Sequence, residues 1–485
     1  LAQAIRRLKF EEFFFIQLSL LKMKQHRKKI NLSYPFSNIG DHFNSFYKKQ
    51  LPFELTDAQK RVLKEIRLDV ASGKQMNRLV QGDVGSGKTI VALMVMLMAK
   101  DNGFQACLMA PTEILAIQHV QGLEDMVDAV GMKMALLTGS TKIARRREIH
   151  EALEVGELDI LVGTHALLED KVKYKNLGLA IIDEQHRFGV SQRSKMWKKN
   201  DKPPHILVMT ATPIPRTLAM TVYGDLDISV IDELPPGRKP ISTLHKTDKH
   251  RLSLFHFLKK EIELGRQVYI VYPLIEESKT LDYKDLMDGY ESICRHFPRP
   301  QFQVSIVHGR MKSDDKEVEM ARFVKGETHI MVATTVIEVG VNVPNASVMV
   351  VESAERFGLS QLHQLRGRVG RGAEKSYCIL MSDSKLSFDA KYRIKTMVQT
   401  QDGFEIANAD LKLRGPGDIL GTRQSGLLNL KLGDVTKDSK ILEYARKTAK
   451  EILANDQDLT KETNRLIKKE YMRAHHNKIQ WSDIS

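Results

Sequence analysis

Residues 82–89 form the sequence Gly-Asp-Val-Gly-Ser-Gly-Lys-Thr, which fits the phosphate-binding pattern G-x-x-x-x-G-K-[ST] at every fixed position. An apolar stretch at 78–81 precedes it and a helix-like run at 90–99 follows, giving the strand–loop–helix context that the pattern requires. Glycines let backbone N–H groups turn toward phosphate oxygens, and the helix N-terminus adds partial positive charge. We expect Lys88 to reach the β- and γ-phosphates of ATP and the Thr89 hydroxyl to ligate Mg²⁺. The residues predicted to bind the nucleotide here are Gly82, Gly85, Ser86, Gly87, Lys88 and Thr89.

A pair of carboxylates offers the second half of a nucleotide site. Asp183-Glu184-Gln185-His186 follows the apolar residues 179–182, so both carboxylates fall at the C-terminal end of a predicted strand, where open α/β sheets bind ligands. We expect Asp183 to hold Mg²⁺, usually through water, and Glu184 to orient the water that attacks the γ-phosphate. An isolated Asp-Glu pair is usually an ordinary loop, but a phosphate loop upstream favours the catalytic interpretation.

Residues 364–371, Gln-Leu-Arg-Gly-Arg-Val-Gly-Arg, concentrate guanidinium groups in the second half of the chain. Arg368 and Arg371 are three residues apart and would share one face of a helix. Together with Gln364 they complete the predicted catalytic set, because guanidinium groups from a facing domain can stabilise the transferring phosphoryl group. Hydrolysis would then depend on closure of the cleft between two domains. The alternative is a basic surface helix.

Residues 53–59, Phe-Glu-Leu-Thr-Asp-Ala-Gln, precede the phosphate loop and could recognise adenine. Phe53 would stack on the ring and Gln59 would pair with its N6/N7 edge. Taken alone, Thr56-Asp57 is simply a helix N-cap.

Several predicted strands end in loops with small or hydroxylic residues. Thr210 and Thr212, in Thr210-Ala211-Thr212-Pro213, could bridge the carboxylate pair to a nucleic-acid groove. Other such loops suit contact with a phosphate backbone, although each by itself is also an ordinary turn or cap. The residues predicted to contact a nucleic-acid backbone are Thr112, Gly139, Thr164, Arg310 and Thr334.

The composition is that of a globular protein with a polyanionic partner. Of 485 residues, 42% are hydrophobic and 28% charged, and no apolar run approaches the roughly 20 residues needed to cross a bilayer. The apolar stretch 13–21 precedes its basic residues, the wrong order for a signal peptide. Three cysteines lie far apart, which predicts neither a zinc site nor a disulfide and favours the cytosol. The net charge of +14 favours nucleic acid, the alternative being a solvated surface.

The order of predicted elements divides the chain into four parts. Residues 1–50 form a helix from Ala4 to about Lys28 and a polar loop, 51–232 and 233–388 are two strand–helix series, and 389–485 hold a helical hairpin, a loop and a charged helical tail. Strands are predicted at 105–110, 133–137, 158–162, 179–182 and 206–209, then at 268–271, 303–307, 329–333, 347–351 and 376–380. Only the first series has a phosphate loop, so we expect one nucleotide between the two. The chain begins at Leu1 inside a predicted helix, so we expect it to be a fragment lacking an N-terminal part.

In this order, the blocks resemble the superfamily 2 helicase and translocase core over nearly the whole chain. The resemblance is strongest to RecG-type branched-DNA translocases. It rests on the loop GDVGSGKT, the DEQH box followed by 187–190 (Arg-Phe-Gly-Val), 211–217 (Ala-Thr-Pro-Ile-Pro-Arg-Thr) and the segment 403–426, which looks like the translocation motif of that family.

The resemblance implies an α/β fold with two tandem RecA-like parallel-sheet domains, a nucleotide cleft between them, a helical N-terminal segment and a C-terminal helical hairpin with a translocation loop. It implies ATP and Mg²⁺ as cofactors. The residues it assigns to translocation and coupling are His186, Thr210, Thr212, Arg393, Arg414 and Gln424. The family also carries an N-terminal wedge domain that splits the fork, which we expect this chain to lack. We therefore interpret Phe13, Phe14 and Phe15 as packing residues of the first helix, not as a base-stacking platform.

The function implied is that of an ATP-dependent double-stranded DNA translocase or helicase that remodels stalled replication forks and branched intermediates such as Holliday junctions. The implied partners are double-stranded and branched DNA, with single-strand-binding or other fork proteins and no membrane. We expect a monomer in the bacterial cytoplasm, associated with the nucleoid.

Three alternatives remain open. A transcription-repair coupling factor shares the translocation module, but would carry DEEQ at the carboxylate box and a polymerase-binding domain, which we do not find in this sequence. A non-hydrolysing nucleic-acid-binding protein with a relic motor fold would show a broken catalytic set. An RNA substrate is disfavoured by the 403–426 segment, and residue 185 is Gln where DEAD-box RNA helicases have Ala.

Overall fold

The structure is a computed structural model of the chain, and it divides into two compact units. The first comprises 1–82, 87–233 and 414–485, and the second comprises 83–86 and 234–413. The described residues are 1–30, 32–184, 199–215, 218–219, 221, 226–235, 239–273, 279–334, 343–370, 372, 375–419 and 430–476.

The first unit is built on a sheet of seven parallel strands in the order β3-β4-β2-β5-β6-β1-β7. The strands are β1 (Asn77–Gly82), β2 (Gln105–Met109), β3 (Met134–Leu137), β4 (Ile160–Gly163), β5 (Leu177–Asp183), β6 (His205–Thr210) and β7 (Asp227–Ile231). Because these pairs run parallel, the C-terminal ends of the strands lie at one edge of the sheet, the edge where ligands bind in such folds.

Helices cover both faces of this sheet. Alternate residues of one strand enter different cores: Leu108 packs in one core and Cys107 in the other. The helices are α2 (Asp41–Ser45), α3 (Asp57–Val70), α4 (Lys88–Asp101), α5 (Glu113–Asp128) and α6 (Ile143–Val155). Buried side chains of α3, α4 and α5 belong to the first core, and those of α6 to the second. A capping box between Thr56 and Gln59 starts α3, and Gly156 ends α6 in the left-handed region at φ 83°.

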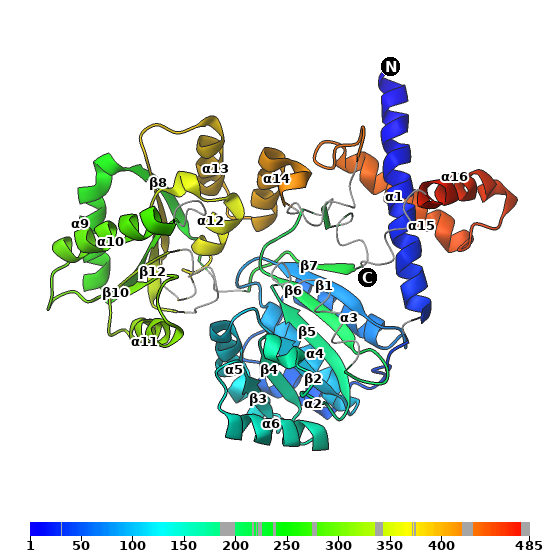
Figure 1. Cartoon of the computed structure of the whole chain (residues 1–485), viewed down its shortest axis with the longest axis horizontal. Helices are drawn as coiled ribbons and strands as arrows, with labels where there is room; N and C mark the ends of the chain where they lie inside the picture. Colours follow the sequence, from blue (N-terminus) through cyan, green and yellow to red (C-terminus); the bar gives the residue numbers. More distant parts are fainter. Residues whose placement is uncertain are drawn as a thin grey trace. The chain divides into compact units, whose positions relative to one another are not determined.

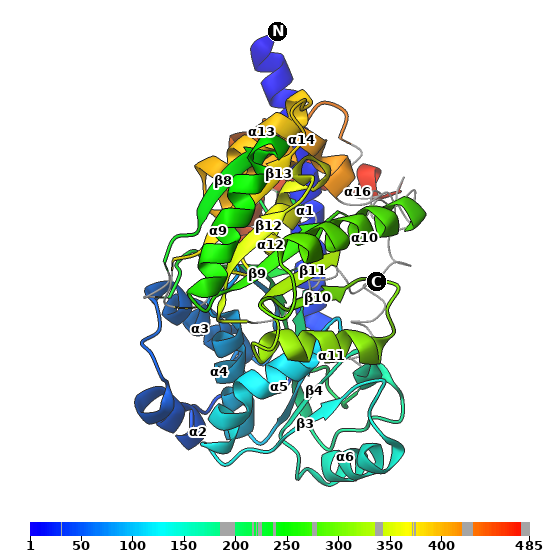
Figure 2. The same ribbon diagram turned by 90° about the vertical axis from the view of Figure 1, so that its left-hand side faces the viewer.

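The second unit is built on six parallel strands in the order β10-β11-β9-β12-β13-β8. The strands are β8 (Ser242–Thr247), β9 (Gln267–Tyr272), β10 (Val304–Val307), β11 (Ile330–Thr334), β12 (Ala346–Val351) and β13 (Tyr377–Ser382). The helices are α9 (Arg251–Glu263), α10 (Lys279–His296), α11 (Ser313–Val324), α12 (Leu359–Arg366) and α13 (Phe388–Gln399). Helix α11 lies beside β10, and α10 contacts β11 (Figure 2).

The two ends of the chain pack on each other within the first unit. The long helix α1 (Ala2–Ile30) lies along α15 (Ser439–Asn455), with α16 (Arg465–His476) beside them (Figure 1). Phe13 and Phe14 are buried against α15 residues such as Leu442 and Leu453. The Glu12 carboxylate accepts the backbone N–H groups of 431–433, which fixes the start of this segment on α1. The prediction that the phenylalanines of the first helix are packing residues is therefore confirmed, with Phe15 partly buried against the same core.

The predicted fold class of two parallel-sheet domains with flanking helical segments is confirmed. Two strands, β7 and β8, were not predicted, and each lies at an edge of its sheet. Helix α14 (Gly403–Ile419) covers the first part of the segment 403–426 that resembles the translocation motif.

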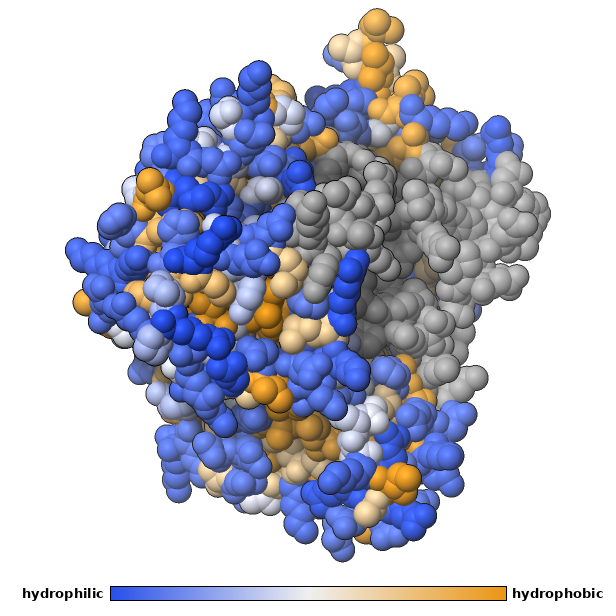
Figure 3. All heavy atoms as spheres, turned by 60° about the vertical axis from the view of Figure 1, so that its left-hand side comes forward, coloured by the Kyte–Doolittle hydropathy of each residue, from blue (hydrophilic) through white to orange (hydrophobic). Residues whose placement is uncertain are grey.

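Within the described ranges, no helix combines the length and the apolar character needed to cross a bilayer. On the face drawn in Figure 3, the described side chains are mostly hydrophilic and the hydrophobic ones form small separate groups.

Candidate active site

The phosphate loop joins β1 to α4 with the backbone geometry that its glycines permit. Gly85 and Gly87 have φ values of 78° and 82°, in the left-handed region that side chains disfavour. No side-chain hydrogen bond caps the N-terminus of α4, and the partial positive charge of this helix end favours a bound anion. Lys88 is buried and its Nζ donates to the Gly82 carbonyl at 2.7 Å. The lysine is thus held on the loop, next to where phosphates would bind.

Asp183 is the last residue of β5, and one strand, β6, lies between β5 and β1 in the sheet. His119, a buried residue of α5, donates from Nε2 to Asp183 Oδ2 at 2.9 Å, and the Glu184 backbone N–H donates to Oδ1 at 3.1 Å. Burial raises the pKa of the Asp183 carboxyl, but the His119 hydrogen bond and charge, together with the Lys88 charge, outweigh it and lower the pKa below its usual value. The carboxylate is therefore ionised at neutral pH, as a metal ligand must be.

The donor set fits Mg²⁺ held jointly by protein and phosphates. Thr89 follows Lys88 in the first turn of α4, and Asp183 offers an ionised oxygen at the same sheet edge. Across the part of the chain that the structure describes, no group of three or more His, Cys, Asp or Glu could hold a metal alone. Mg²⁺ is commonly bound by one or two protein oxygens plus substrate phosphates and waters, which is what these residues allow.

Glu184 lies in a strained backbone conformation beside the end of β6. Its φ of 55° is in the left-handed region, which is costly for a residue with a side chain. Its Oε2 accepts from Thr210 Oγ1 at 3.5 Å and from the Ala211 backbone N–H at 3.4 Å. The Thr210 and Thr212 hydroxyls are 2.9 Å apart. The structure therefore brings three of the predicted site residues, Glu184, Thr210 and Thr212, into one cluster.

The predicted adenine readers lie at the start of α3. Phe53 is 39% exposed, so its ring is accessible for stacking. Gln59 is fully buried, and its Oε1 accepts the Thr56 backbone N–H at 2.9 Å in the capping box. That bond fixes the orientation of the Gln59 amide, which stays a predicted adenine contact.

In the second unit, the arginine segment leaves its helix earlier than the sequence suggested. Helix α12 ends at Arg366, so Arg368 lies in the following turn, where it is buried, and Gly370 takes a φ of 79°. The expectation that Arg368 and Arg371 share one face of a helix is therefore wrong, because Arg368 lies beyond the end of α12. Arg371 lies outside the described residues. Gln364 lies on the last turn of α12.

Arg366, for which we predicted no role from the sequence, links α12 to α13 of the predicted helical hairpin. Its buried guanidinium donates to the carbonyls of Met397 at 2.9 Å, Thr400 at 2.8 Å and Gln401 at 3.3 Å, all at the C-terminal end of α13. Arg393 on α13 donates to the Glu355 carbonyl at 2.8 Å, just beyond β12. These bonds hold the hairpin on the second sheet.

The remaining predicted coupling residues lie wholly or partly outside the described residues. His186 and Gln424 lie outside the described residues, and so does the side chain of Arg414, whose backbone belongs to α14.

The predicted backbone-contact residues lie at or just after the ends of strands. Thr112, Gly139 and Thr164 come after β2, β3 and β4, at the edge of the first sheet that also carries the phosphate loop. Arg310 follows β10 and Thr334 ends β11 in the second sheet. The Thr112 hydroxyl caps α5, accepting a backbone N–H at 3.4 Å. Their contact with nucleic acid stays a prediction.

His119 is the site residue that sequence reasoning missed most clearly. It lies 64 residues before Asp183, and no spacing rule links a helical histidine to a distant carboxylate. Arg366 stood inside the quoted arginine segment, but only the fold reveals the carbonyls that it contacts.

Family models match most of this chain in three consecutive blocks. A DEAD/DEAH box helicase model matches 56–221, a helicase conserved C-terminal domain matches 252–373, and a model described as "ATP-dependent DNA helicase RecG, domain 3, C-terminal" matches 400–485. With two parallel-sheet units and a phosphate loop near the carboxylate pair, the chain has a superfamily 2 helicase core.

Its relatives specify the family. The chain is 52% identical over 459 residues to ATP-dependent DNA helicase RecG of Synechocystis sp., and the match covers 95% of this chain and 55% of the relative. It is 49% identical over 455 residues to ATP-dependent DNA helicase RecG of Bacillus subtilis, and that match covers 93% of this chain and 66% of the relative. A structure of RecG bound to a three-way DNA junction has a TM-score of 0.73 and 43% identity, over 91% of this chain and 57% of that one. The chain belongs to the RecG family. It spans about 55 to 66% of the length of these relatives.

The DUF1998 helicase MrfA bound to DNA, with a TM-score of 0.56 and 17% identity over 86% of this chain and 58% of that one, shares the fold alone.

Proposed function

We propose that this chain is the motor of an ATP-dependent double-stranded DNA translocase or helicase that remodels stalled forks and branched recombination intermediates, Holliday junctions included. The observation that carries the proposal is the ionised Asp183 at the sheet edge that also holds the phosphate loop and Glu184, in a chain of the RecG family. The RecG structure with a three-way DNA junction supports branched DNA as the substrate.

The proposed division of labour follows the geometry. The phosphate loop and the N-terminus of α4 bind the phosphates, with Lys88 moving from the Gly82 carbonyl to a phosphate oxygen. Thr89 and Asp183 hold Mg²⁺, which neutralises charge on the β- and γ-phosphates. Glu184 orients the attacking water, and its contact with Thr210 links the carboxylate to the loop after β6.

The second unit would supply charge stabilisation and coupling. Arg368 and Arg371, with Gln364, would complete the catalytic set. Arg393, Arg414, Gln424 and His186 would transmit nucleotide state to the DNA. We keep the division into a helical segment (1–50), two helicase domains (51–232 and 233–388) and a translocation region (389–485). The proposal includes a monomer working in the bacterial cytoplasm.

The deciding experiment is steady-state ATP hydrolysis with no nucleic acid, linear duplex, a three-way junction and structured RNA. DNA is expected to stimulate turnover and RNA is not. Lys88→Ala and Glu184→Gln should abolish turnover, whereas Lys64→Ala, an exposed control on α3, should not. Stimulation by RNA alone, or hydrolysis that survives in both site variants, would refute the proposal.

DNA affinity provides a second check. If backbone phosphates dominate, the logarithm of the affinity should fall linearly with log salt, by about 0.9 per phosphate neutralised. A flat salt response would contradict contact through the basic surface of this chain, whose net charge is +14.

A further inference from the structure

A buried glutamine, Gln81, joins the end of β1 to the loop that follows β6. It lies one residue before Gly82, the last residue of β1, and its side chain is fully buried. Its Oε1 accepts the backbone N–H of Ile214 at 3.2 Å, from a position 133 residues away in the sequence. Ile214 packs against the same core as Leu79, which lies two residues before Gln81 on β1. One side-chain amide therefore connects the strand before the phosphate loop to a second loop of the site.

The loop held by this bond is the one that contacts Glu184. The Ala211 backbone N–H donates to Glu184 Oε2 at 3.4 Å. The Thr210 and Thr212 hydroxyls are 2.9 Å apart. Thr210 is the last residue of β6 and lies opposite Gln81 in the pairing of β1 with β6. The strand pairing thus fixes one end of this loop, and the Gln81 amide fixes the other.

The second polar atom of the Gln81 amide lacks a hydrogen-bond partner. Because the Ile214 N–H is a donor, the atom that faces it is the oxygen, and the remaining atom is Nε2. Among the described residues, Nε2 has no acceptor, and it is shielded from solvent. A buried donor without an acceptor is costly. The cost favours a second arrangement of the site in which Nε2 finds an acceptor.

We propose that Gln81 is a positioning residue of the ATPase, which sets the orientation of Glu184 through the loop after β6 and changes it when nucleotide binds. The inference rests on the proposed function and adds a residue to it. Gln81 acts indirectly, through Ile214 at one end of the loop and Thr210 at the other.

The nucleotide reaches Gln81 through the neighbouring peptide. Lys88 Nζ donates to the Gly82 carbonyl at 2.7 Å, and bound phosphates would draw the lysine away from it. β1 pairs with β6 on one side and with β7 on the other, so its backbone resists a large shift. The side chain of Gln81 is the part that can turn when the lysine leaves.

After this turn, Nε2 donates to the hydroxyl of Thr210, its neighbour on β6. A hydroxyl has two acceptor lone pairs and can accept this bond while it donates its own proton. A hydroxyl that accepts a hydrogen bond also donates a stronger one. The contact from Thr210 Oγ1 to Glu184 Oε2, 3.5 Å long before nucleotide binds, should then shorten. Glu184 would be held for the attacking water only when the phosphate loop is occupied.

The test compares ATP hydrolysis by the wild type, Gln81→Met and Ile214→Pro, with and without duplex DNA. Methionine keeps an unbranched side chain in the core but has no N–H donor and only a weak acceptor. Proline removes the backbone N–H that Gln81 accepts. Each variant should lower the DNA-stimulated kcat about 10- to 100-fold and leave the KM for ATP nearly unchanged. Because both changes break one bond, the double variant should lose no more than the more affected single variant.

Gln75→Met is the matched control. Gln75 is a second buried glutamine, just before β1, and its Nε2 donates to the Pro204 carbonyl, just before β6, at 2.9 Å. Its bond joins the same two strands at the end away from the phosphate loop. The control should therefore keep the wild-type kcat and KM. Ile214→Val keeps the backbone N–H and should also match the wild type.

Affinity for a fluorescent ADP analogue reports whether each variant is folded. Wild-type kcat in Gln81→Met, an equal loss in Gln75→Met, or additive losses in the double variant would overturn the inference. So would ADP affinity that falls along with kcat in both Gln81→Met and Ile214→Pro, because the bond would then have only a structural role. A wild-type chain whose hydrolysis DNA does not stimulate would instead contradict the proposed function itself.

Discussion

Replacing His119 with alanine tests how much of the metal site depends on a residue that touches neither nucleotide nor metal. Its Nε2 donates to Asp183 Oδ2 at 2.9 Å from a buried position on α5. The alanine variant removes this donor and leaves Asp183, Lys88 and the phosphate loop unchanged. The carboxylate would lose part of both its orientation and the interaction that lowers its pKa.

The expected size follows from the kind of bond that is lost. A hydrogen bond to a charged group contributes about 1.5–3 kcal/mol. Partners that hold a metal ligand in place typically change metal affinity or activity by about 10- to 100-fold when removed. We therefore expect His119→Ala to weaken Mg²⁺-dependent nucleotide binding about 10- to 100-fold. Binding without Mg²⁺ should change little, because Lys88 still supplies its charge.

The assay is titration of a fluorescent ADP analogue in Mg²⁺ and in EDTA, with the Mg²⁺ dependence of ATP hydrolysis alongside. His119→Gln, whose amide can donate a hydrogen bond, should recover part of the loss. Gln121→Ala, an exposed position on the same helix, should match the wild type. If His119→Ala keeps the wild-type Mg²⁺ dependence, or loses nucleotide binding equally in EDTA, the assignment of His119 as a positioning residue is refuted.

Three further predictions concern the scaffold. Arg366→Ala removes the donor to three carbonyls at the end of α13, so the free energy of unfolding in urea should fall by about 3 kcal/mol or more. The control Arg295→Ala, at an exposed position, should lower it by under about 0.5 kcal/mol. A loss below about 1 kcal/mol for Arg366→Ala would contradict this prediction. Burial, opposed by the hydrogen bond to the Tyr34 carbonyl, lowers the pKa of His205 to about 4. The contribution of the neutral ring to the free energy of unfolding should therefore be complete above about pH 6.5. It should fall by about 3 kcal/mol as the pH drops toward 4. His205→Gln should flatten that part of the stability profile, and an unchanged slope would exclude the ring as its source. Phe13→Ala opens the core between α1 and α15 and should cost about 3–5 kcal/mol, seen as faster hydrogen exchange in α15; unchanged exchange there would show that the two helices do not depend on each other.

The parts of this protein that could be predicted from sequence are those whose chemistry lies in consecutive residues. The phosphate loop is recognisable because its glycines, lysine and threonine act through one short stretch of backbone, and Gly85 and Gly87 take the left-handed φ values that the pattern requires. Eight of the ten predicted strands that match are central in their sheets, where parallel strands are continuous apolar runs. The edge strands β7 and β8 lack that pattern, because both are only partly buried along their length, and neither was predicted.

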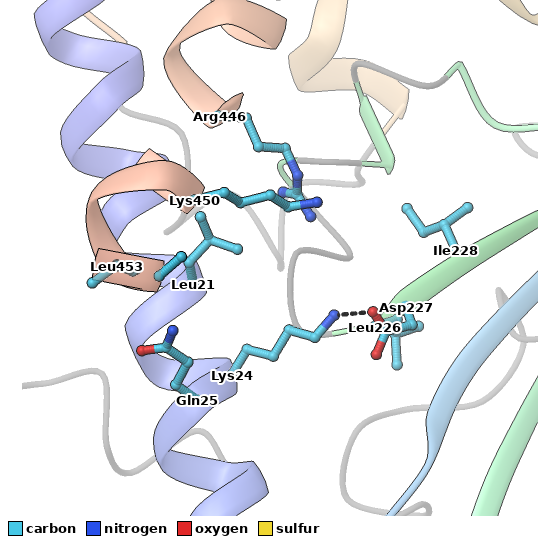
Figure 4. A pocket seen from close by; sticks show the side chains of 10 residues that line it. Leu21, Lys24, Gln25, Leu226, Asp227, Ile228, Arg446, Lys450 and Leu453 are labelled. Carbon is cyan, nitrogen blue, oxygen red and sulfur yellow. Dashed lines mark hydrogen bonds and ion pairs between the residues drawn. The ribbon is translucent and has the colours of Figure 1, made fainter. Parts of the chain in front are cut away.

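Only the tertiary structure decided which distant side chains meet. His119 reaches Asp183 because α5 packs on the sheet that contains β5. Arg366 reaches the end of α13 because α12 and α13 pack against each other. Lys24, Asp227 and Arg446 line one pocket of the first unit, although they lie far apart in the sequence (Figure 4). Local backbone geometry depends on neighbouring residues and can be read from their spacing. Contacts between elements depend on how whole helices and strands share a core, and residue order alone does not specify them.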